Sequence, residues 1–126
     1  MPTTSMTGFA ARLGVAEVDA DDGSARLEFD VSEEHLNPAG TLHGGVLATL
    51  VDTAMGAAVR SSTGDDDVPA TSQLTVTYLR PGKPGRLVVT ARLRTRGEHL
   101  TVCDADVVQD DRELVHAVAT FAVLHR

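Results

Sequence analysis

The spacing of apolar residues divides the chain into helical and extended segments. From about Leu42 to Ser61, apolar side chains recur at intervals of three and four residues, which is the repeat of an α-helix. The residues that form this stripe are Leu47, Leu50, Val51, Ala54, Met55 and Ala58. Residues 6–14 predict a second, short helix that Gly14 would end. Residues 32–41 are rich in turn formers and predict a loop before the long helix.

Alternation of apolar and polar residues predicts strands on both sides of the long helix. The strand segments are residues 15–31, 70–81, 85–97 and 98–126. The first contains a turn at Asp21-Asp22-Gly23, and the last contains a hairpin turn at Gln109-Asp110-Asp111. This order of elements predicts an α+β fold in which an antiparallel sheet lies against one helix. Because that helix is apolar on more than one side, we expect the sheet to wrap around it.

Composition limits the classes of protein to consider. A chain of 126 residues predicts one domain, residues 1–126, whose modest core favours association with further copies. The formal net charge of −7 argues against nucleic acid or an anionic membrane as a partner. One cysteine, Cys103, excludes an intrachain disulfide and suits the cytoplasm, where we place the protein. We expect neither a signal peptide nor a membrane span, because no long uninterrupted apolar stretch is present.

One acidic residue interrupts the apolar pattern of the long helix. Asp52 is the only ionisable residue between His43 and Arg60. The helix face that it occupies otherwise carries small residues: Gly45, Thr49 and Gly56. A solvated Asp on an exposed helix face is the simplest interpretation. The scarcity of other polar groups around Asp52 instead favours a functional carboxylate that a ligand or a second backbone can approach closely.

The start of the same helix carries a second candidate feature. Unpaired N–H groups at a helix N-terminus, together with the helix dipole, suit a carbonyl oxygen that becomes an oxyanion. His43-Gly44-Gly45 occupies this position, although the glycines would equally serve tight packing. Asp52 comes nine positions after His43, which corresponds to a rise of roughly 13 Å and to opposite sides of a helix. The two features therefore cannot meet within one chain, but they could meet across a two-fold dimer.

Together these residues resemble the hotdog-fold acyl-CoA thioesterases, in their PaaI-like branch. The matching pattern consists of Asn37, Gly40, His43-Gly44-Gly45 and Asp52, followed by the small residues TAMGAA at 53–58. The resemblance implies a hotdog fold, with an antiparallel sheet of about five to six strands wrapped around one long central helix. It also implies hydrolysis of a small or aromatic acyl-CoA without a metal or a separate cofactor. We expect a homodimer at least, assembled as a dimer of dimers.

The resemblance also implies roles for individual residues. Asp52 would be the catalytic carboxylate, acting either as the nucleophile or as the base on a water molecule. The backbone N–H of Gly44 or of Gly45 would polarise the thioester carbonyl. Thr71, which matches a Ser or Thr position of the family, would assist the water. In this family Asp52 and Thr71 would face the helix start of the opposite subunit.

Two further residues receive positioning roles from the same resemblance. Asn37 would orient the water or the thioester, and His43 would form a hydrogen bond near the thioester and shape the loop. Because a thiolate leaves readily, the reaction requires little acid assistance. One carboxylate and backbone donors would then suffice.

A run of basic residues is a candidate site for the phosphates of coenzyme A. Residues 80–96 hold six of the chain's eleven basic residues without an acidic interruption. The three arginines at 92, 94 and 96 alternate along a strand, so we expect them to share one face, where they would bind phosphate. A solvated strand face has the same pattern. The resemblance adds contacts near Gly97, although Glu98 replaces a basic residue that the family often has. The candidate coenzyme-binding residues are Arg80, Lys83, Arg92, Arg94, Arg96 and Gly97.

Other functions remain open at this point. The main alternative is a non-catalytic acyl-CoA-binding hotdog protein, which would be expected to lack the acid or to carry a DNA-binding module. A hotdog hydratase would need a different Asp/His spacing, and a purely structural dimer would leave Asp52 without a purpose. His99, His116 and His125 show no metal-ligand spacing, so we interpret them as structural and predict no metal site. We interpret Cys103 as a core residue.

Overall fold

Helix α2, Gly44–Arg60, begins where the sequence supplies a capping side chain. In the computed structural model, which describes residues 1–125, His43 precedes this helix, and its Nδ1 accepts a hydrogen bond from the Gly45 N–H at 2.8 Å. Leu42 lies outside the helix because it pairs with Leu36 in an isolated bridge. The predicted apolar stripe is buried, and its completely buried members are Leu50, Val51, Ala54, Met55 and Ala58.

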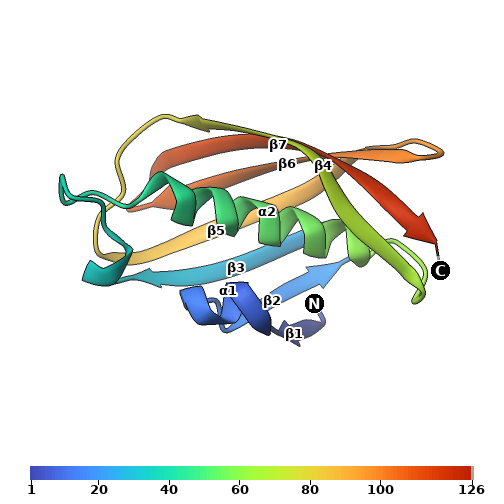
Figure 1. Cartoon of the computed structure of the whole chain (residues 1–126), viewed down its shortest axis with the longest axis horizontal. Coiled ribbons are helices and arrows are strands. Elements are labelled where there is room, and N and C mark those ends of the chain that lie inside the picture. Colours follow the sequence, from blue (N-terminus) through green and yellow to red (C-terminus); the bar gives the residue numbers. More distant parts are fainter. Residues whose placement is uncertain (126) are drawn as a thin grey trace.

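Seven strands form one antiparallel sheet that curves around α2 (Figure 1). The strands are β1 (Thr3–Ser5), β2 (Glu17–Asp21), β3 (Ser24–Val31), β4 (Asp67–Tyr78), β5 (Gly85–Arg96), β6 (Leu100–Gln109) and β7 (Arg112–His125). Their order across the sheet is β1-β2-β3-β5-β6-β7-β4, which makes β4 an edge strand. This confirms the predicted hotdog arrangement of one long helix within an antiparallel sheet.

The sequence predicted only some of the short elements. Helix α1, Gly8–Leu13, ends at Gly14, whose φ of 123° requires glycine. A 3₁₀ helix, η1 (Glu33–His35), lies within the segment predicted as a loop. Strand β1 is additional to the five to six strands expected. Its three residues are polar and exposed and show no alternation. Backbone pairing with β2 and a hydrogen bond from the Thr3 hydroxyl to Asp19 hold them in the sheet.

The sheet has an inner face, toward α2, and an outer face, away from it. In β3, four alternate residues point inward and are buried: Ala25, Leu27, Phe29 and Val31. Cys103 on β6 also points inward and is fully buried, as predicted for a core residue. Burial raises the pKa of its thiol to about 11, and the nearby Asp104 carboxylate adds to the increase. Within residues 1–125, no helix combines the length and the apolar character needed to cross a bilayer.

A β-bulge in β5 overturns the prediction that three arginines share one strand face. Arg92 pairs with Asp104 on β6, but the register then shifts, so that Arg96 pairs with the buried Thr101. Arg94 is the extra residue of the bulge. Because one inserted residue reverses the alternation of side chains, Arg96 lies on the inner face and Arg92 on the outer face. A local sequence pattern cannot reveal this insertion, since it depends on pairing with β6.

Candidate active site

Asp52 of α2 and Thr71 of β4 meet on one side of the helix. The Thr71 hydroxyl donates a hydrogen bond to Asp52 Oδ1 at 2.7 Å. Asp52 is half-buried, and its Oδ2 has no hydrogen-bond partner among residues 1–125. The arrangement therefore holds the carboxylate by one oxygen and leaves the other available.

A second β-bulge turns Thr71 toward the helix. Thr71 pairs with Phe121, which is buried on the inner face, whereas Gln73 pairs with Thr120. Ser72 is the extra residue between them. In a regular strand, Thr71 would lie on the same face as Gln73, away from α2. Its contact with Asp52 therefore depends on the bulge.

A cavity of about 600 Å³ opens beside Asp52. Asp52, Thr71 and Gly56 form part of its wall, and Phe121 contributes an aromatic edge. The N-terminal segment closes another side, since Thr4 of β1 and the flanking Pro2 and Met6 also line the cavity. The N-terminal segment thus belongs to the surroundings of Asp52, although the sequence offered no signal for this role.

At the start of α2, the two glycines are not equivalent. The Gly45 N–H donates to His43 Nδ1 at 2.8 Å, whereas the Gly44 N–H has no hydrogen-bond acceptor among the described residues. Gly44 is also tightly packed, because an added Cβ would lie 3.2 Å from the Tyr78 ring and hydroxyl and would require Tyr78 to shift by a few tenths of an ångström. Of the two candidate oxyanion donors, Gly44 is therefore the one whose N–H remains available.

Tyr78 is a residue of this region that the sequence did not identify. Its hydroxyl donates a hydrogen bond to the Gly44 carbonyl oxygen at 2.8 Å. It also lines a second cavity of about 440 Å³, together with Leu42, Leu47 and Leu79. This cavity and the one beside Asp52 have no lining residue in common, as the nine-residue spacing predicts.

Asn37 holds the loop that leads into α2. Its Oδ1 accepts hydrogen bonds from the N–H groups of Ala39 and Thr41 at 3.0 and 3.2 Å. Its Nδ2 donates to the Thr41 hydroxyl at 2.9 Å. All hydrogen bonds of this side chain within residues 1–125 thus belong to the loop, and in one chain they do not connect Asn37 with Asp52.

The candidate coenzyme-binding residues occupy different parts of the surface. Lys83 lies 3.1 Å from Asp110, and Arg80 donates to the Glu113 carbonyl oxygen at 2.8 Å. The arginines at 92 and 94 lie 3.0 and 3.7 Å from the two carboxylate oxygens of Asp104. These positions therefore do not converge on one phosphate site.

Arg96 and Gly97 lie together near the end of α2. The Arg96 guanidinium donates to the carbonyl and the hydroxyl of Ser62. Both residues line a cavity of about 150 Å³, which Ser62 and Thr63 also line. Arg96 also lines a neighbouring cavity of about 550 Å³, together with Arg92 and Ser62.

Potential metal ligands gather elsewhere. Within the part of the chain that the structure describes, one group of three has its donor atoms within 4.8 Å of one another: Asp106, Glu113 and His116. None of them lines either cavity along α2.

Comparisons with known proteins place this chain and its fold in a family. Residues 39–116 match the model of the thioesterase superfamily. Acyl-coenzyme A thioesterase 13 of Homo sapiens is 36% identical over 107 residues, which are 82% of this chain and 75% of the relative. Acyl-coenzyme A thioesterase PaaI of Escherichia coli is 33% identical, over 84% of this chain and 74% of the relative.

Solved structures agree with these relatives. The conserved protein PA5202 of Pseudomonas aeruginosa has a TM-score of 0.90 and 30% identity, covering 94% of this chain and 95% of its own. The family match, residues 39–116, contains the whole of α2 and strands β4, β5 and β6. The chain therefore belongs to the thioesterase superfamily, in its hotdog-fold PaaI-like branch, and is a thioester hydrolase.

Proposed function

We propose that the chain hydrolyses a small or aromatic acyl-CoA to the free acid and coenzyme A. The observation that carries this proposal is the pair of half-sites along α2. One half consists of the Asp52 carboxylate held by Thr71, and the other consists of the free Gly44 N–H at the helix start. The printed names of the human and Escherichia coli relatives, both acyl-coenzyme A thioesterases, support coenzyme A as the thiol part of the substrate.

The proposed site is completed by a second copy of the chain. Gly44 and Asp52 are eight residues apart on one helix, a rise of about 12 Å, which is too far for both to act on one carbonyl group. Strand β4 is an edge of the sheet, and its unpaired backbone groups are available for pairing with another copy. A two-fold dimer would bring each Asp52 toward the partner's Gly44 and would form two equivalent sites. We retain the dimer of dimers as part of this proposal.

The chemistry follows from the two half-sites. The thioester oxygen accepts a hydrogen bond from the Gly44 N–H, which stabilises the negative charge that develops on it. Asp52 either removes a proton from an attacking water or attacks the carbonyl carbon itself. The C–S bond then breaks, and the thiolate leaves and takes up a proton. If water attacked, this step gives the free acid; if Asp52 attacked, water then hydrolyses the acyl–Asp52 anhydride, which releases the acid and restores the carboxylate. The Thr71 hydroxyl orients the carboxylate through Oδ1, and Asn37 and His43 keep the loop and the helix start in place.

The position of the coenzyme can also be proposed. Arg92 and Arg94 are already paired with Asp104, so binding phosphate there would compete with an existing ion pair. Arg96 and Gly97 are better candidates because they lie in a cavity at the end of α2. The buried, unpaired thiol of Cys103 suits the reducing cytoplasm, where we propose that the enzyme works.

The test is release of free thiol from a panel of acyl-CoAs: phenylacetyl, hydroxybenzoyl, and short and long aliphatic. We expect the native chain to hydrolyse at least one of them and Asp52→Asn to lower turnover by about 10² or more. Asp66→Asn, which changes an exposed carboxylate in a loop, is the matched control and should keep native turnover. Equal rates for native and Asp52→Asn proteins would contradict the catalytic role. Coenzyme binding without turnover on any thioester would favour the non-catalytic binding protein.

A further inference from the structure

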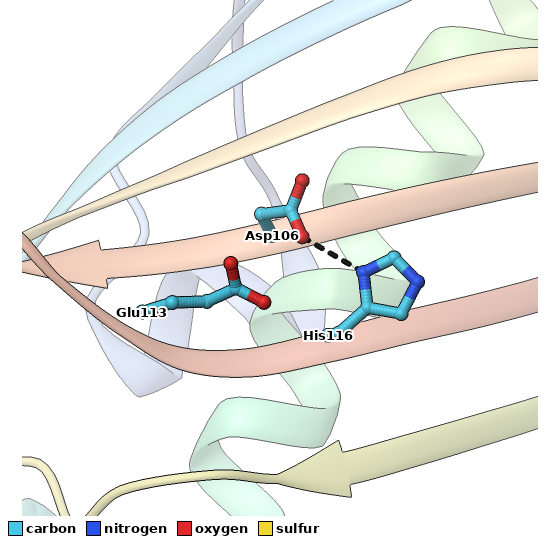
Figure 2. Close-up of side chains that lie close together, drawn as sticks. All are labelled: Asp106, Glu113 and His116. Carbon is cyan, nitrogen blue, oxygen red and sulfur yellow. Dashed lines mark hydrogen bonds and ion pairs between the residues drawn. The ribbon is translucent and has the colours of Figure 1, made fainter.

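Three side chains on the outer face of the sheet lie close enough to hold one ion. Asp106 comes from β6, and Glu113 and His116 come from β7. Each offers one ligand atom, and these atoms lie within 4.8 Å of one another. Figure 2 shows the two carboxylates gathered at the edge of the His116 ring that carries Nδ1, with α2 behind the strands. The group is separate from the residues proposed for thioester hydrolysis.

Glu113 reaches this face because of a third β-bulge. His116 pairs directly with Asp106, but the register then shifts so that Glu113 pairs with Val108. Leu114 is the extra residue, and it is buried. In a regular strand, residues three positions apart lie on opposite faces. The bulge therefore places Glu113 beside His116, as bulges do where they redirect a side chain.

The charges of the group are also unusual for this surface. The other carboxylates on the outer face of the central strands lie 2.8 to 3.0 Å from arginine nitrogens: Glu28, Asp30 and Asp104. Within residues 1–125, neither Asp106 nor Glu113 forms an ion pair with a lysine or an arginine. Asp106 Oδ1 lies 2.8 Å from His116 Nδ1, and that imidazole is its only charged or chargeable partner among the described residues. Asp106 thus pairs with the imidazole, whereas the Glu113 carboxylate, within 4.8 Å of both, has no ion-pair partner among residues 1–125, and this arrangement favours a cation.

We propose that Asp106, Glu113 and His116 bind a divalent transition-metal ion, with Zn²⁺ the best fit. One imidazole nitrogen and two carboxylate oxygens are ligands that Zn²⁺ accepts at about 2.0–2.2 Å. Ca²⁺ and Mg²⁺ prefer oxygen ligands alone, so His116 selects against them. The flexible Glu113 side chain would close the remaining distance, and water would take the fourth position. The ion would occupy the place of the proton between His116 and Asp106, so acid would weaken binding.

The experiment measures Zn²⁺ binding to the full chain, without an affinity tag, by isothermal titration calorimetry. We expect one Zn²⁺ per chain. His116→Ala and Glu113→Gln should each weaken binding by at least about tenfold, since even residues that only support a metal ligand have effects of that size. His125→Ala is the matched control, because His125 also pairs with an aspartate, Asp67, at 2.6 Å. That pair has no third potential ligand among the described residues, so the control should bind Zn²⁺ like the native chain.

Three results would overturn the proposal: no binding by the native chain, unchanged affinity in both ligand variants, or an equal loss in His125→Ala. Thermal unfolding without Zn²⁺ verifies that each variant is folded, and Glu113→Gln preserves the shape of the side chain. Added Zn²⁺ should raise the unfolding temperature of the native and His125→Ala proteins, but not that of His116→Ala. Because no step requires a thioester substrate, the metal proposal is independent of the proposed function.

Discussion

At the scale of single residues, two side chains fix one peptide group at the start of α2. The peptide between Gly44 and Gly45 is held at both ends. Tyr78 donates to its carbonyl oxygen and His43 Nδ1 accepts from its N–H, each at 2.8 Å. These two contacts fix the first turn of the helix, and the Gly44 N–H is left without a partner among residues 1–125. Tyr78 is therefore a positioning residue in the proposed mechanism.

Replacing Tyr78 by Phe should remove this hydrogen bond and keep the ring that packs against Gly44. A net loss of about 1–1.5 kcal/mol in positioning corresponds to a decrease in kcat of roughly tenfold. KM should change little, because the ring still lines the cavity. Steady-state kinetics on the best acyl-CoA of the panel would measure both constants. Thr77→Val, one residue earlier on β4, is the control, and a native kcat in Tyr78→Phe would argue against the positioning role.

At the scale of secondary-structure elements, the turn between β6 and β7 has an unfavourable backbone. Its two residues, Asp110 and Asp111, have φ angles of 51° and 62°. Such two-residue turns favour glycine at the second position, because non-glycine residues are strained at positive φ. Asp110 forms an ion pair with Lys83 at 3.1 Å, which a substitution there would remove. Asp111 is therefore the better position for a glycine substitution.

Asp111→Gly should therefore stabilise the protein by about 0.5–1 kcal/mol, once the greater flexibility of glycine in the unfolded chain is subtracted. Urea denaturation would show this as a higher midpoint with an unchanged slope. Asp66→Gly is the control, since Asp66 does not have a positive φ, and this change should give no gain. A lower midpoint in Asp111→Gly would show that the aspartate side chain contributes more than the relief of strain.

At the scale of the whole molecule, the proposed site requires two copies of the chain, and mixing of inactive variants tests this. Asp52→Asn removes one half-site. Gly44→Ala disturbs the other, because its Cβ would lie 3.2 Å from Tyr78. Random pairing makes half of the dimers mixed, and each mixed dimer has one of its two sites intact. Co-expression should then restore about a quarter of native activity.

Each variant alone should form dimers and remain inactive, which size-exclusion chromatography and the thiol-release assay would establish. Recovery of thioesterase activity after co-expression would locate the site between subunits. The two purified variants should remain inactive when they are mixed under conditions that prevent subunit exchange. If co-expressed variants that form mixed dimers stayed inactive, Asp52 and Gly44 would have to act within one chain. The spacing along α2 argues against that outcome.

Much of this molecule could be predicted from local pattern. The repeat along α2 and the alternation in β3 and β5 depend on which residues are apolar and how far apart they lie. These properties are local to each segment and do not depend on its tertiary contacts. The isolation of Asp52 and the glycines at the helix start are equally visible in the sequence. Strand β1 was missed because three polar residues show no alternation and are held only by their neighbour.

By itself, the sequence determined the elements other than β1 and η1, their order, and the residues around which a thioesterase site could form. Only the tertiary structure decided where Thr71, Arg96 and Glu113 point, because each lies within two residues of the extra residue of a β-bulge. One extra residue reverses the face on which the following side chains lie. Whether it is accommodated depends on the partner strand and not on the segment itself. The contact with Asp52, the inward turn of Arg96 and the proposed Zn²⁺ site are all consequences of strand pairing.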